Sequence, residues 1–204
     1  MYTDPPLAPA FCAPRFSTPK IWIVGDSIVH WAALLARERK EWNLGLPVHI
    51  TWKGKRGLRL NGLREYIATF RNSATVPSLV IIHAGTNDIG YLQKRQLLAG
   101  IADSVYYIHG LTDAVRVVWS DILPRVTYAN FPPDKQNIPD RIRRAANKYA
   151  RTVTRRINGS SIPHPQIGFR SAELFFRDGV HLSDRGTTIF MSDIRQAIVS
   201  ALFE

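Results

Sequence analysis

Residues 21–40 read IWIVGDSIVHWAALLARERK, and this stretch decides the fold of the chain. Ile21 to Val24 form a short apolar run of the kind that makes a buried strand, and Gly25 ends it. From Ile28 to Lys40 the apolar side chains recur at helical spacing, on one side of the helix. That side carries Ile28, Trp31, Leu34 and Leu35. The sequence therefore predicts a strand, a short polar loop and a helix in direct succession.

Short apolar runs and longer amphipathic stretches alternate along the rest of the chain. Further strands are expected at residues 48–52, 79–82 and 115–119, with a weaker one near 166–169. Further helices are expected at residues 60–70, 91–109, 141–157 and 183–203. Apolar strands that alternate with helices are typical of a parallel sheet covered by helices on both faces. The sequence therefore predicts an α/β fold without internal repeats.

The beginning of the chain differs from the rest, because residues 1–19 contain repeated prolines and show neither helical nor strand periodicity. Proline removes a backbone donor and favours extended conformations. We therefore expect residues 1–19 to be a flexible lead and residues 20–204 to be one domain. A chain of 204 residues with 45% hydrophobic content is long enough to bury one full core and too short for two comfortable domains. Such a chain is compatible with being one module of a longer polyprotein.

Composition also bears on the compartment and on partners. Cys12 is the single cysteine, so no internal disulfide forms, and no signal-like segment opens the chain. No stretch approaches the ~20 apolar residues that a membrane-spanning helix needs. We therefore expect a soluble, intracellular protein, cytoplasmic by default. The net charge of +11 favours polyanions such as nucleic acid or an anionic membrane, but an ordinary basic surface accounts for it equally well.

Three polar motifs follow the predicted strands or precede the last helix. Gly25-Asp26-Ser27 follows the first strand, Gly85-Thr86-Asn87-Asp88 follows the third, and Asp178-Gly179-Val180-His181 lies before the closing helix. In a doubly wound sheet, ligands bind outside the carboxyl ends of the strands. All three motifs are expected at that edge, and together they are stronger evidence for a site than any one alone.

Their residue types fit acyl transfer. A serine hydroxyl becomes a nucleophile when a base accepts its proton, and a carboxylate that orients the base improves it. Ser27, His181 and Asp178 match these three roles. Each also has an ordinary structural interpretation, because Ser27 suits a helix N-cap and the Asp178 to His181 segment suits a polar turn.

An acyl-transfer site also needs donors for the oxyanion of the tetrahedral intermediate. Asn87 offers a side-chain amide, and the backbone N–H groups of Ser27 and of a glycine after the second strand could complete the set. That loop contains Gly54 and Gly57, and we prefer Gly57 because it is expected immediately before the second helix. The alternatives are a helix-entry turn at Gly57 and an Asx-turn at Asn87.

No metal or cofactor is assigned. His83 follows the third predicted strand and could approach the site, but no second histidine or cysteine stands at metal-ligand spacing. His49, His109 and His164 carry no signal.

In these residues the chain resembles the SGNH hydrolases, also called GDSL-type esterases and lipases. Ser27 matches the nucleophile of that family's first block, Gly57 the glycine of its second block and Asn87 the asparagine of its third. Asp178 and His181 match the Asp-x-x-His of its fifth block. The resemblance covers residues 21–203.

The resemblance implies a flavodoxin-like three-layer α/β/α sandwich with a five-stranded parallel sheet. It also implies hydrolysis of small acyl or acetyl esters by a Ser27-His181-Asp178 triad, an oxyanion hole of Ser27, Gly57 and Asn87, and no metal or cofactor. The second block is unusually basic for the family, so the resemblance leaves the substrate open. Its basic residues are Lys53, Lys55, Arg56 and Arg59.

A second resemblance concerns context. Residues 22–31, together with the Pro-rich lead and the basic surface, are similar to SGNH domains carried by vertebrate retrotransposons. The predicted helix 141–157 carries a positive stripe opposite an apolar one, and the stripe is either a solvated face or a surface for nucleic acid or anionic lipid. It comprises Arg141, Arg144, Lys148, Arg151 and Arg155. Two hypotheses remain: an esterase, or an accessory binding module of a mobile element with little or no catalysis.

Overall fold

A computed structural model describes residues 17–72, 76–112, 114–168 and 170–204. At its centre is a parallel sheet with the strand order β2-β1-β3-β4-β5. The strands are β1 (Lys20–Gly25), β2 (His49–Gly54), β3 (Leu79–His83), β4 (Arg116–Ser120) and β5 (Ser160–Ile162). This order and the all-parallel pairing confirm the predicted flavodoxin-like architecture.

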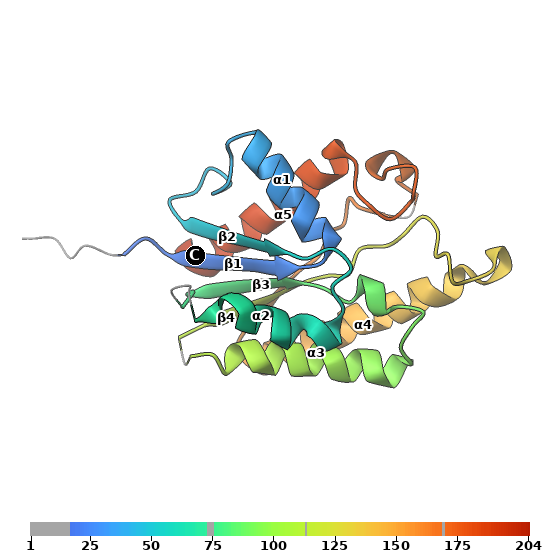
Figure 1. The fold of residues 1–204 in the computed structure, drawn as a ribbon, viewed down its shortest axis with the longest axis horizontal. Coiled ribbons are helices and arrows are strands. Elements are labelled where there is room, and N and C mark those ends of the chain that lie inside the picture. The colour runs from blue at the N-terminus through green and yellow to red at the C-terminus, as the bar shows by residue number, and fades with distance from the viewer. Residues whose placement is uncertain (1–16, 73–75, 113, 169) are drawn as a thin grey trace, which may run out of the picture.

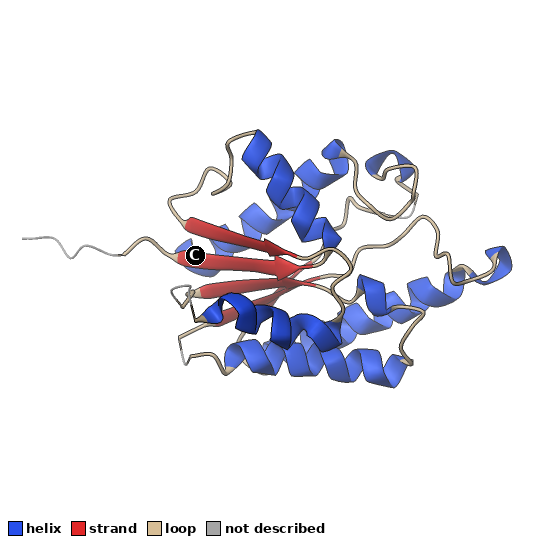
Figure 2. Cartoon of the chain, viewed as in Figure 1, coloured by secondary structure: helices blue, strands red, loops and turns tan. Residues whose placement is uncertain are grey.

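Helices cover both faces of the sheet, as Figures 1 and 2 show. One face carries α1 (Ser27–Glu38) and α5 (Asp184–Phe203). The other carries α2 (Leu63–Arg71), α3 (Lys94–His109) and α4 (Asn137–Arg155). The chain therefore forms three layers, with the carboxyl ends of the strands and the loops that follow them at the right-hand side of Figure 1.

The interior strand β1 explains why the chain folds this way. Successive side chains of a strand point to opposite faces, so an uninterrupted apolar run suits a strand that is covered on both sides. Ile21 and Ile23 pack into the core under α1 and α5. Trp22 and Val24 pack into the core on the opposite face. All four are buried, and the two hydrophobic cores meet at this strand.

The fifth strand is not where the sequence predicted it. Residues 166–168 form a turn and irregular chain, residue 169 lies outside the described residues, and β5 instead occupies Ser160–Ile162. This strand is three residues long and lies at the edge of the sheet. Of its side chains only Ile162 is buried, so it leaves almost no apolar pattern in the sequence.

Helix boundaries differ from the predicted ones by a few residues. The helix predicted at 141–157 begins four residues earlier, at Asn137, and includes Pro139 in its first turn. Proline is tolerated there because the first backbone N–H groups of a helix have no partner within the helix. The helix predicted at 60–70 divides into a short 3-10 turn, Leu60–Gly62, followed by α2.

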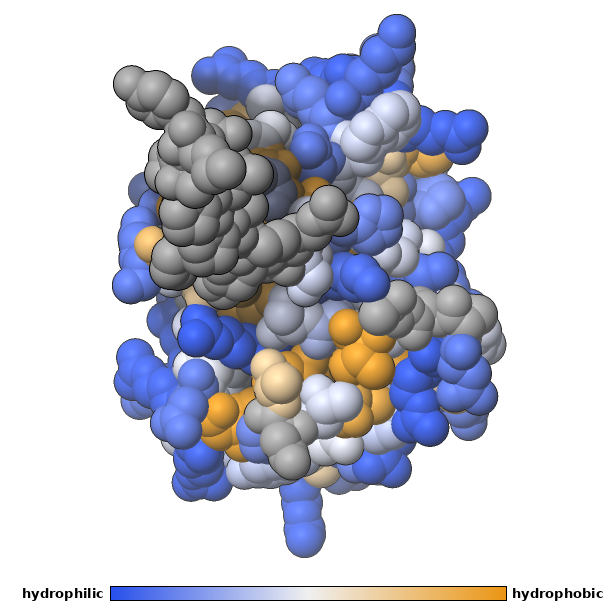
Figure 3. All heavy atoms as spheres, turned by 90° about the vertical axis from the view of Figure 1, so that its left-hand side faces the viewer, coloured by the Kyte–Doolittle hydropathy of each residue, from blue (hydrophilic) through white to orange (hydrophobic). Residues whose placement is uncertain are grey.

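The proposed Pro-rich lead lies almost wholly outside the described residues. Within them, Pro19 still accepts a hydrogen bond from the backbone N–H of His49, and β1 begins at Lys20. The end of the molecule at the amino ends of the strands, away from the polar motifs, is largely hydrophilic with apolar patches between (Figure 3). Among the helices that the structure describes, none combines the length and apolarity needed to cross a bilayer.

Because α1 and β2 lie in close contact, a single methyl group added between them should lower the stability of the fold. A Cβ at Gly54 would lie 2.2 Å from the backbone nitrogen of His30, so Gly54→Ala should lower the free energy of unfolding by about 2–3 kcal/mol. Gly62→Ala is the control, because its Cβ would meet nothing nearer than 3.8 Å, and it should change stability by less than about 1 kcal/mol. Urea denaturation measures both, and equal losses would contradict the packing described.

Candidate active site

The first polar motif forms a turn that is held from two sides. The Asp26 N–H donates to the His83 carbonyl of β3 at 3.2 Å, and the Lys55 N–H donates to the Gly25 carbonyl at 2.9 Å. Asp26 is the N-cap of α1, and its Oδ1 accepts the Ile28 N–H at 3.0 Å. The Asp26 side chain therefore caps the first turn of α1. The turn places Ser27 at the first position of α1, at the carboxyl edge of the sheet.

The first and last motifs come together, although 154 positions separate Ser27 from His181. His181 Nε2 lies 3.1 Å from Ser27 Oγ, and His181 Nδ1 lies 2.6 Å from Asp178 Oδ2. With a proton on Nδ1 toward the carboxylate, Nε2 is left to accept the serine proton. Ser27, His181 and Asp178 thus form one continuous hydrogen-bonded chain.

Asp178 is held in place and kept ionised by its own loop. Its Oδ1 accepts the backbone N–H groups of Val180 and His181, both at 2.9 Å. Burial acts to raise the pKa of Asp178, but the hydrogen bonds from the His181 side chain and from these two N–H groups outweigh it and hold the pKa below its usual value. A carboxylate of this kind can stabilise an imidazolium beside it.

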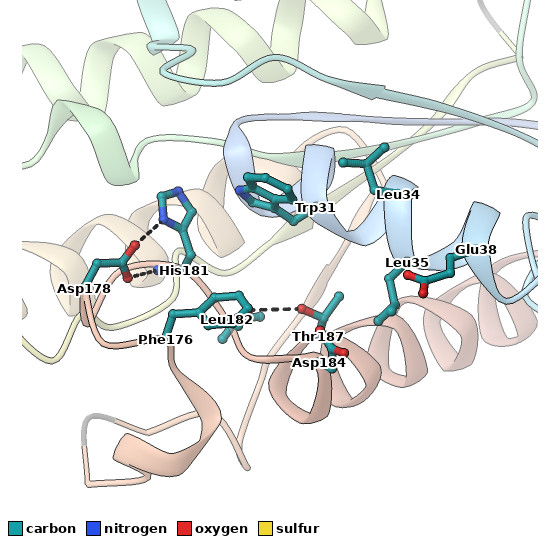
Figure 4. A pocket seen from close by; sticks show the side chains of 10 residues that line it. All are labelled: Trp31, Leu34, Leu35, Glu38, Phe176, Asp178, His181, Leu182, Asp184 and Thr187. Atoms are coloured by element: carbon teal, nitrogen blue, oxygen red, sulfur yellow. Dashed lines mark hydrogen bonds and ion pairs between the residues drawn. The ribbon is translucent and has the colours of Figure 1, made fainter.

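A largely apolar cavity of about 430 Å³ opens beside His181 (Figure 4). Trp31 and Leu34 project into it from α1, and Phe176 and Leu182 border it from the segment around the last motif. Trp31 meets the His181 ring edge to face, with the ring centroids 6.3 Å apart. Trp31 and Phe176 are 38% and 53% exposed, so the cavity is open to solvent.

Two of the three candidate oxyanion residues, Gly57 and Asn87, line a second cavity of about 220 Å³. The Asn87 amide is fixed at both ends: its Nδ2 donates to the Leu58 carbonyl at 3.1 Å, and its Oδ1 accepts from Arg125 at 3.0 Å. One N–H of the amide remains for a ligand. Among the described residues, neither the Ser27 nor the Gly57 backbone N–H has an acceptor, so both are also available.

The structure distinguishes the two glycines of the second block. Gly54 ends β2 and packs directly against the α1 backbone, whereas Gly57 has a left-handed φ of 71° and open space where a Cβ would lie. The positive φ favours glycine at position 57. Gly57 does not precede a helix directly, contrary to the prediction, because two residues separate it from the 3-10 turn Leu60–Gly62.

Hydrogen bonds connect the loops that carry the motifs. Asp88 Oδ2 accepts the Leu60 N–H at 3.1 Å, which joins the third motif to the second block. The Val126 N–H donates to the Gly179 carbonyl at 2.8 Å, which joins the loop after β4 to the last motif.

Burial raises the pKa of Asp26 and of Asp88 to about 6, although one backbone N–H bonded to each acts in the opposite direction.

Sequence reasoning missed two groups of polar residues. One is Arg125, which holds the Asn87 amide from the loop after β4. The other is a buried network in which Ser120 Oγ lies 2.8 Å from both His83 Nδ1 and His164 Nε2. His164 Nδ1 continues it to Asp193 Oδ2 at 2.8 Å. The only sign of this network in the sequence is that a polar residue ends each of two apolar runs: His83 ends one, and Ser120 ends the other.

This second Ser-His-Asp array is internal. Ser120 and His83 have no exposed surface, so a substrate cannot reach the hydroxyl. Burial, with a smaller contribution from the neighbouring His164, lowers the pKa of His83 to about 3. The network joins β3, β4 and α5 behind the site and serves the core. No group of three or more His, Cys, Asp or Glu side chains in the described ranges could hold a metal ion.

Residues 23–189 match the family model described as the GDSL-like lipase/acylhydrolase family. The match spans well over half of the chain, so the chain belongs to this family and is classed with the ester hydrolases. No curated protein sequence matches the chain.

Solved structures share the fold of this chain. A putative acylhydrolase from Bacteroides fragilis has a TM-score of 0.68 at 18% identity, over 92% of each chain. A GDSL-like lipase from Bacteroides thetaiotaomicron has a TM-score of 0.65 at 22% identity, over 90% of this chain and 89% of that one. Axe2-W215I, an acetyl xylan esterase from Geobacillus stearothermophilus, has a TM-score of 0.68 at 15% identity, over 89% and 95%.

The buried Asp88 predicts a specific pH dependence of stability. Because its folded-state pKa of about 6 exceeds the ordinary value of 3.8, the folded protein retains a proton that the unfolded chain loses. Asp88 therefore contributes stability that is lost as pH rises from about 4 to about 6. Asp88→Asn should remove this loss, so that on going from pH 4 to pH 7.5 its stability relative to wild type rises by up to about 3 kcal/mol. Chemical denaturation at both pH values tests this, and a constant difference would contradict it.

Proposed function

We propose that the protein is a serine esterase that hydrolyses a small acyl or acetyl ester. The observation that carries this proposal is the hydrogen-bonded chain from Ser27 through His181 to Asp178 beside an open apolar cavity. Membership of the acylhydrolase family supports the reaction class. An acetyl xylan esterase and an acetyl esterase among the structures of the same fold agree with a small acyl group.

In the first half of the reaction, Ser27 Oγ attacks the ester carbonyl carbon and His181 Nε2 takes the serine proton. Asp178, held ionised, stabilises the imidazolium. The tetrahedral intermediate collapses when His181 returns the proton to the leaving alcohol oxygen, which leaves an acyl group on Ser27. In the second half, His181 activates water in the same way, and the carboxylic acid departs.

The negative charge that develops on the carbonyl oxygen needs donors that are already in place. The Ser27 and Gly57 backbone N–H groups and the free N–H of Asn87 are the proposed donors. The double anchoring of Asn87 by Leu58 and Arg125 supports this role, because an amide that is already oriented need not reorganise during the reaction.

The second hypothesis, a binding module that uses the basic stripe of α4, receives less support. The structure pairs Arg151 with Asp121, and Arg144 Nε lies 3.2 Å from Asp140 Oδ2. Two of the five cations are thus partly neutralised within the chain. Contact with nucleic acid or anionic membrane through Arg141, Lys148 and Arg155, and an origin in a mobile element, stay predictions.

Removal of the nucleophile is the direct test of catalysis. Ser27→Ala should lower kcat for 4-nitrophenyl acetate by at least about 10³-fold, because the hydroxyl forms the acyl-enzyme bond. Ser192→Ala, an exposed serine on α5, is the matched control and should retain wild-type turnover. Equal turnover by wild type and Ser27→Ala would exclude the proposed mechanism.

Replacement of the amide donor tests the oxyanion hole separately. Asn87→Ala should lower kcat by about 10²–10³-fold with little change in KM, since the bond forms mainly in the transition state. Asn137→Ala removes an exposed amide at the start of α4, outside this cavity, and should leave kcat within twofold of wild type, about 0.4 kcal/mol. A change confined to KM in Asn87→Ala would contradict this role.

A further inference from the structure

We propose that the ester substrate carries an anionic group, a carboxylate or a phosphate, and that Arg59 and Arg125 bind it in the cavity beside the oxyanion hole. This inference rests on the proposed esterase function and names the class of its substrate. The cavity is the 220 Å³ one that Gly57 and Asn87 line, so a group bound there lies next to the reacting carbonyl.

Two guanidinium groups reach this cavity from different loops. Arg59 comes from the segment after β2, and Arg125 comes from the loop after β4. Tyr91, Tyr128 and Asn130 also line the cavity, so several neutral donors stand near both cations. The planar fork of arginine matches the geometry of carboxylate and phosphate groups.

Neither cation has a carboxylate partner. Within the described ranges, no Asp or Glu oxygen lies within 4.0 Å of Arg59 or Arg125. Asp26 and Asp178 attract Arg125 and Asp88 attracts Arg59, but only at longer range. Arg125 uses one nitrogen for Asn87, and its Nε is buried without an acceptor. A partly buried guanidinium that lacks its counter-ion is stabilised when an anion binds beside it.

Arg59 is fixed in an accessible position. Its guanidinium carbon lies 3.9 Å from the centroid of the Tyr91 ring, which is 61% exposed. Stacking of this kind restricts the arginine side chain while the N–H groups at its edge stay free to donate. Arg59 is therefore suited to bind an anion with little further loss of side-chain freedom.

The rest of the basic second block adds positive charge in the residues that precede Arg59. Lys53, Lys55 and Arg56 lie over the rings of Phe70, Tyr66 and Trp31, at 4.6, 5.4 and 5.7 Å from the centroids. Clustered charge of one sign raises the local concentration of oppositely charged substrates and their association rate. The unusual charge of this block thus fits an anionic substrate.

The two cavities are expected to hold different parts of the substrate. The leaving oxygen must face His181 Nε2 to receive its proton, and the apolar cavity lies beside that residue. The acyl group then extends on the side of Gly57 and Asn87, toward the two arginines. The expected substrate is therefore an ester whose acyl part ends in an anion, as in the monoester of a dicarboxylic acid.

Three esters test the inference: neutral 4-nitrophenyl acetate, mono-4-nitrophenyl glutarate with an anionic acyl group, and 4-acetoxybenzoate with an anionic alcohol. Arg59→Gln should lower kcat/KM for the glutarate ester at least about tenfold more than for the acetate, the effect of losing one charge-assisted contact. The loss should fall mainly on KM. If Arg59→Gln lowers kcat/KM selectively for 4-acetoxybenzoate alone, the cavity still binds the anion, but it holds the alcohol part of the ester rather than the acyl part.

Arg64→Gln is the matched control, because Arg64 also lies over a tyrosine ring, that of Tyr107 at 4.8 Å, but pairs with Asp103 outside the cavity. It should leave the ratio between the esters unchanged. The inference would be overturned if Arg59→Gln lowered kcat/KM equally for all three esters, or if it left the preference for an anionic ester over the acetate unchanged.

A binding measurement separates this inference from the proposed function. Calorimetric titration of the wild-type protein with glutarate should show binding that weakens at least about tenfold in Arg59→Gln and not in Arg64→Gln. If no ester is hydrolysed faster by wild type than by Ser27→Ala, the esterase proposal fails, and glutarate binding still decides whether the cavity is an anion site. Equal affinity of wild type and Arg59→Gln for glutarate would refute the anion site even in an active esterase.

Discussion

The hydrogen bonds that hold the Gly25-Asp26-Ser27 turn are the constraint on which the site depends. β3 accepts the Asp26 N–H through the His83 carbonyl, and the residue after β2 donates to the Gly25 carbonyl. The Asp26 side chain then caps α1. Because three adjacent elements fix this one turn, Ser27 begins α1 with its hydroxyl directed to the last loop, and the neighbouring loops can be arranged around it.

Those loops are joined to one another as well as to the sheet. Asp88 binds the Leu60 N–H, Asn87 binds the Leu58 carbonyl, and Gly179 accepts from Val126. The loops that would hold the reacting carbonyl therefore form a connected unit rather than independent segments, which is what a preorganised site requires. Two buried carboxyl groups lie inside this unit. Because their pKa values are raised, ionisation of these two groups lowers the free energy of unfolding near neutral pH.

Much of this arrangement could be predicted from the sequence. The apolar run at 21–24 and the helical spacing after it identify a strand that packs into two cores and a helix that packs into one of them, and apolar burial alone sets that pattern. The three polar motifs could be assigned to one edge because parallel strands end together. β5 escaped prediction because it is short, lies at an edge and buries a single side chain. Arg125 escaped because its role depends on Asn87, a residue 38 positions away. The contact between them exists only in the folded chain.

We propose that the turn presents Ser27 as the one nucleophile that His181 activates. Reaction with a fluorophosphonate, followed by mass spectrometry of the peptides, tests it directly, because such reagents bond to an activated serine oxygen as an ester carbonyl would. We expect one adduct per chain, on Ser27, and its loss in His181→Ala. An adduct on Ser120 or another serine, or equal labelling of Ser27 without His181, would contradict it.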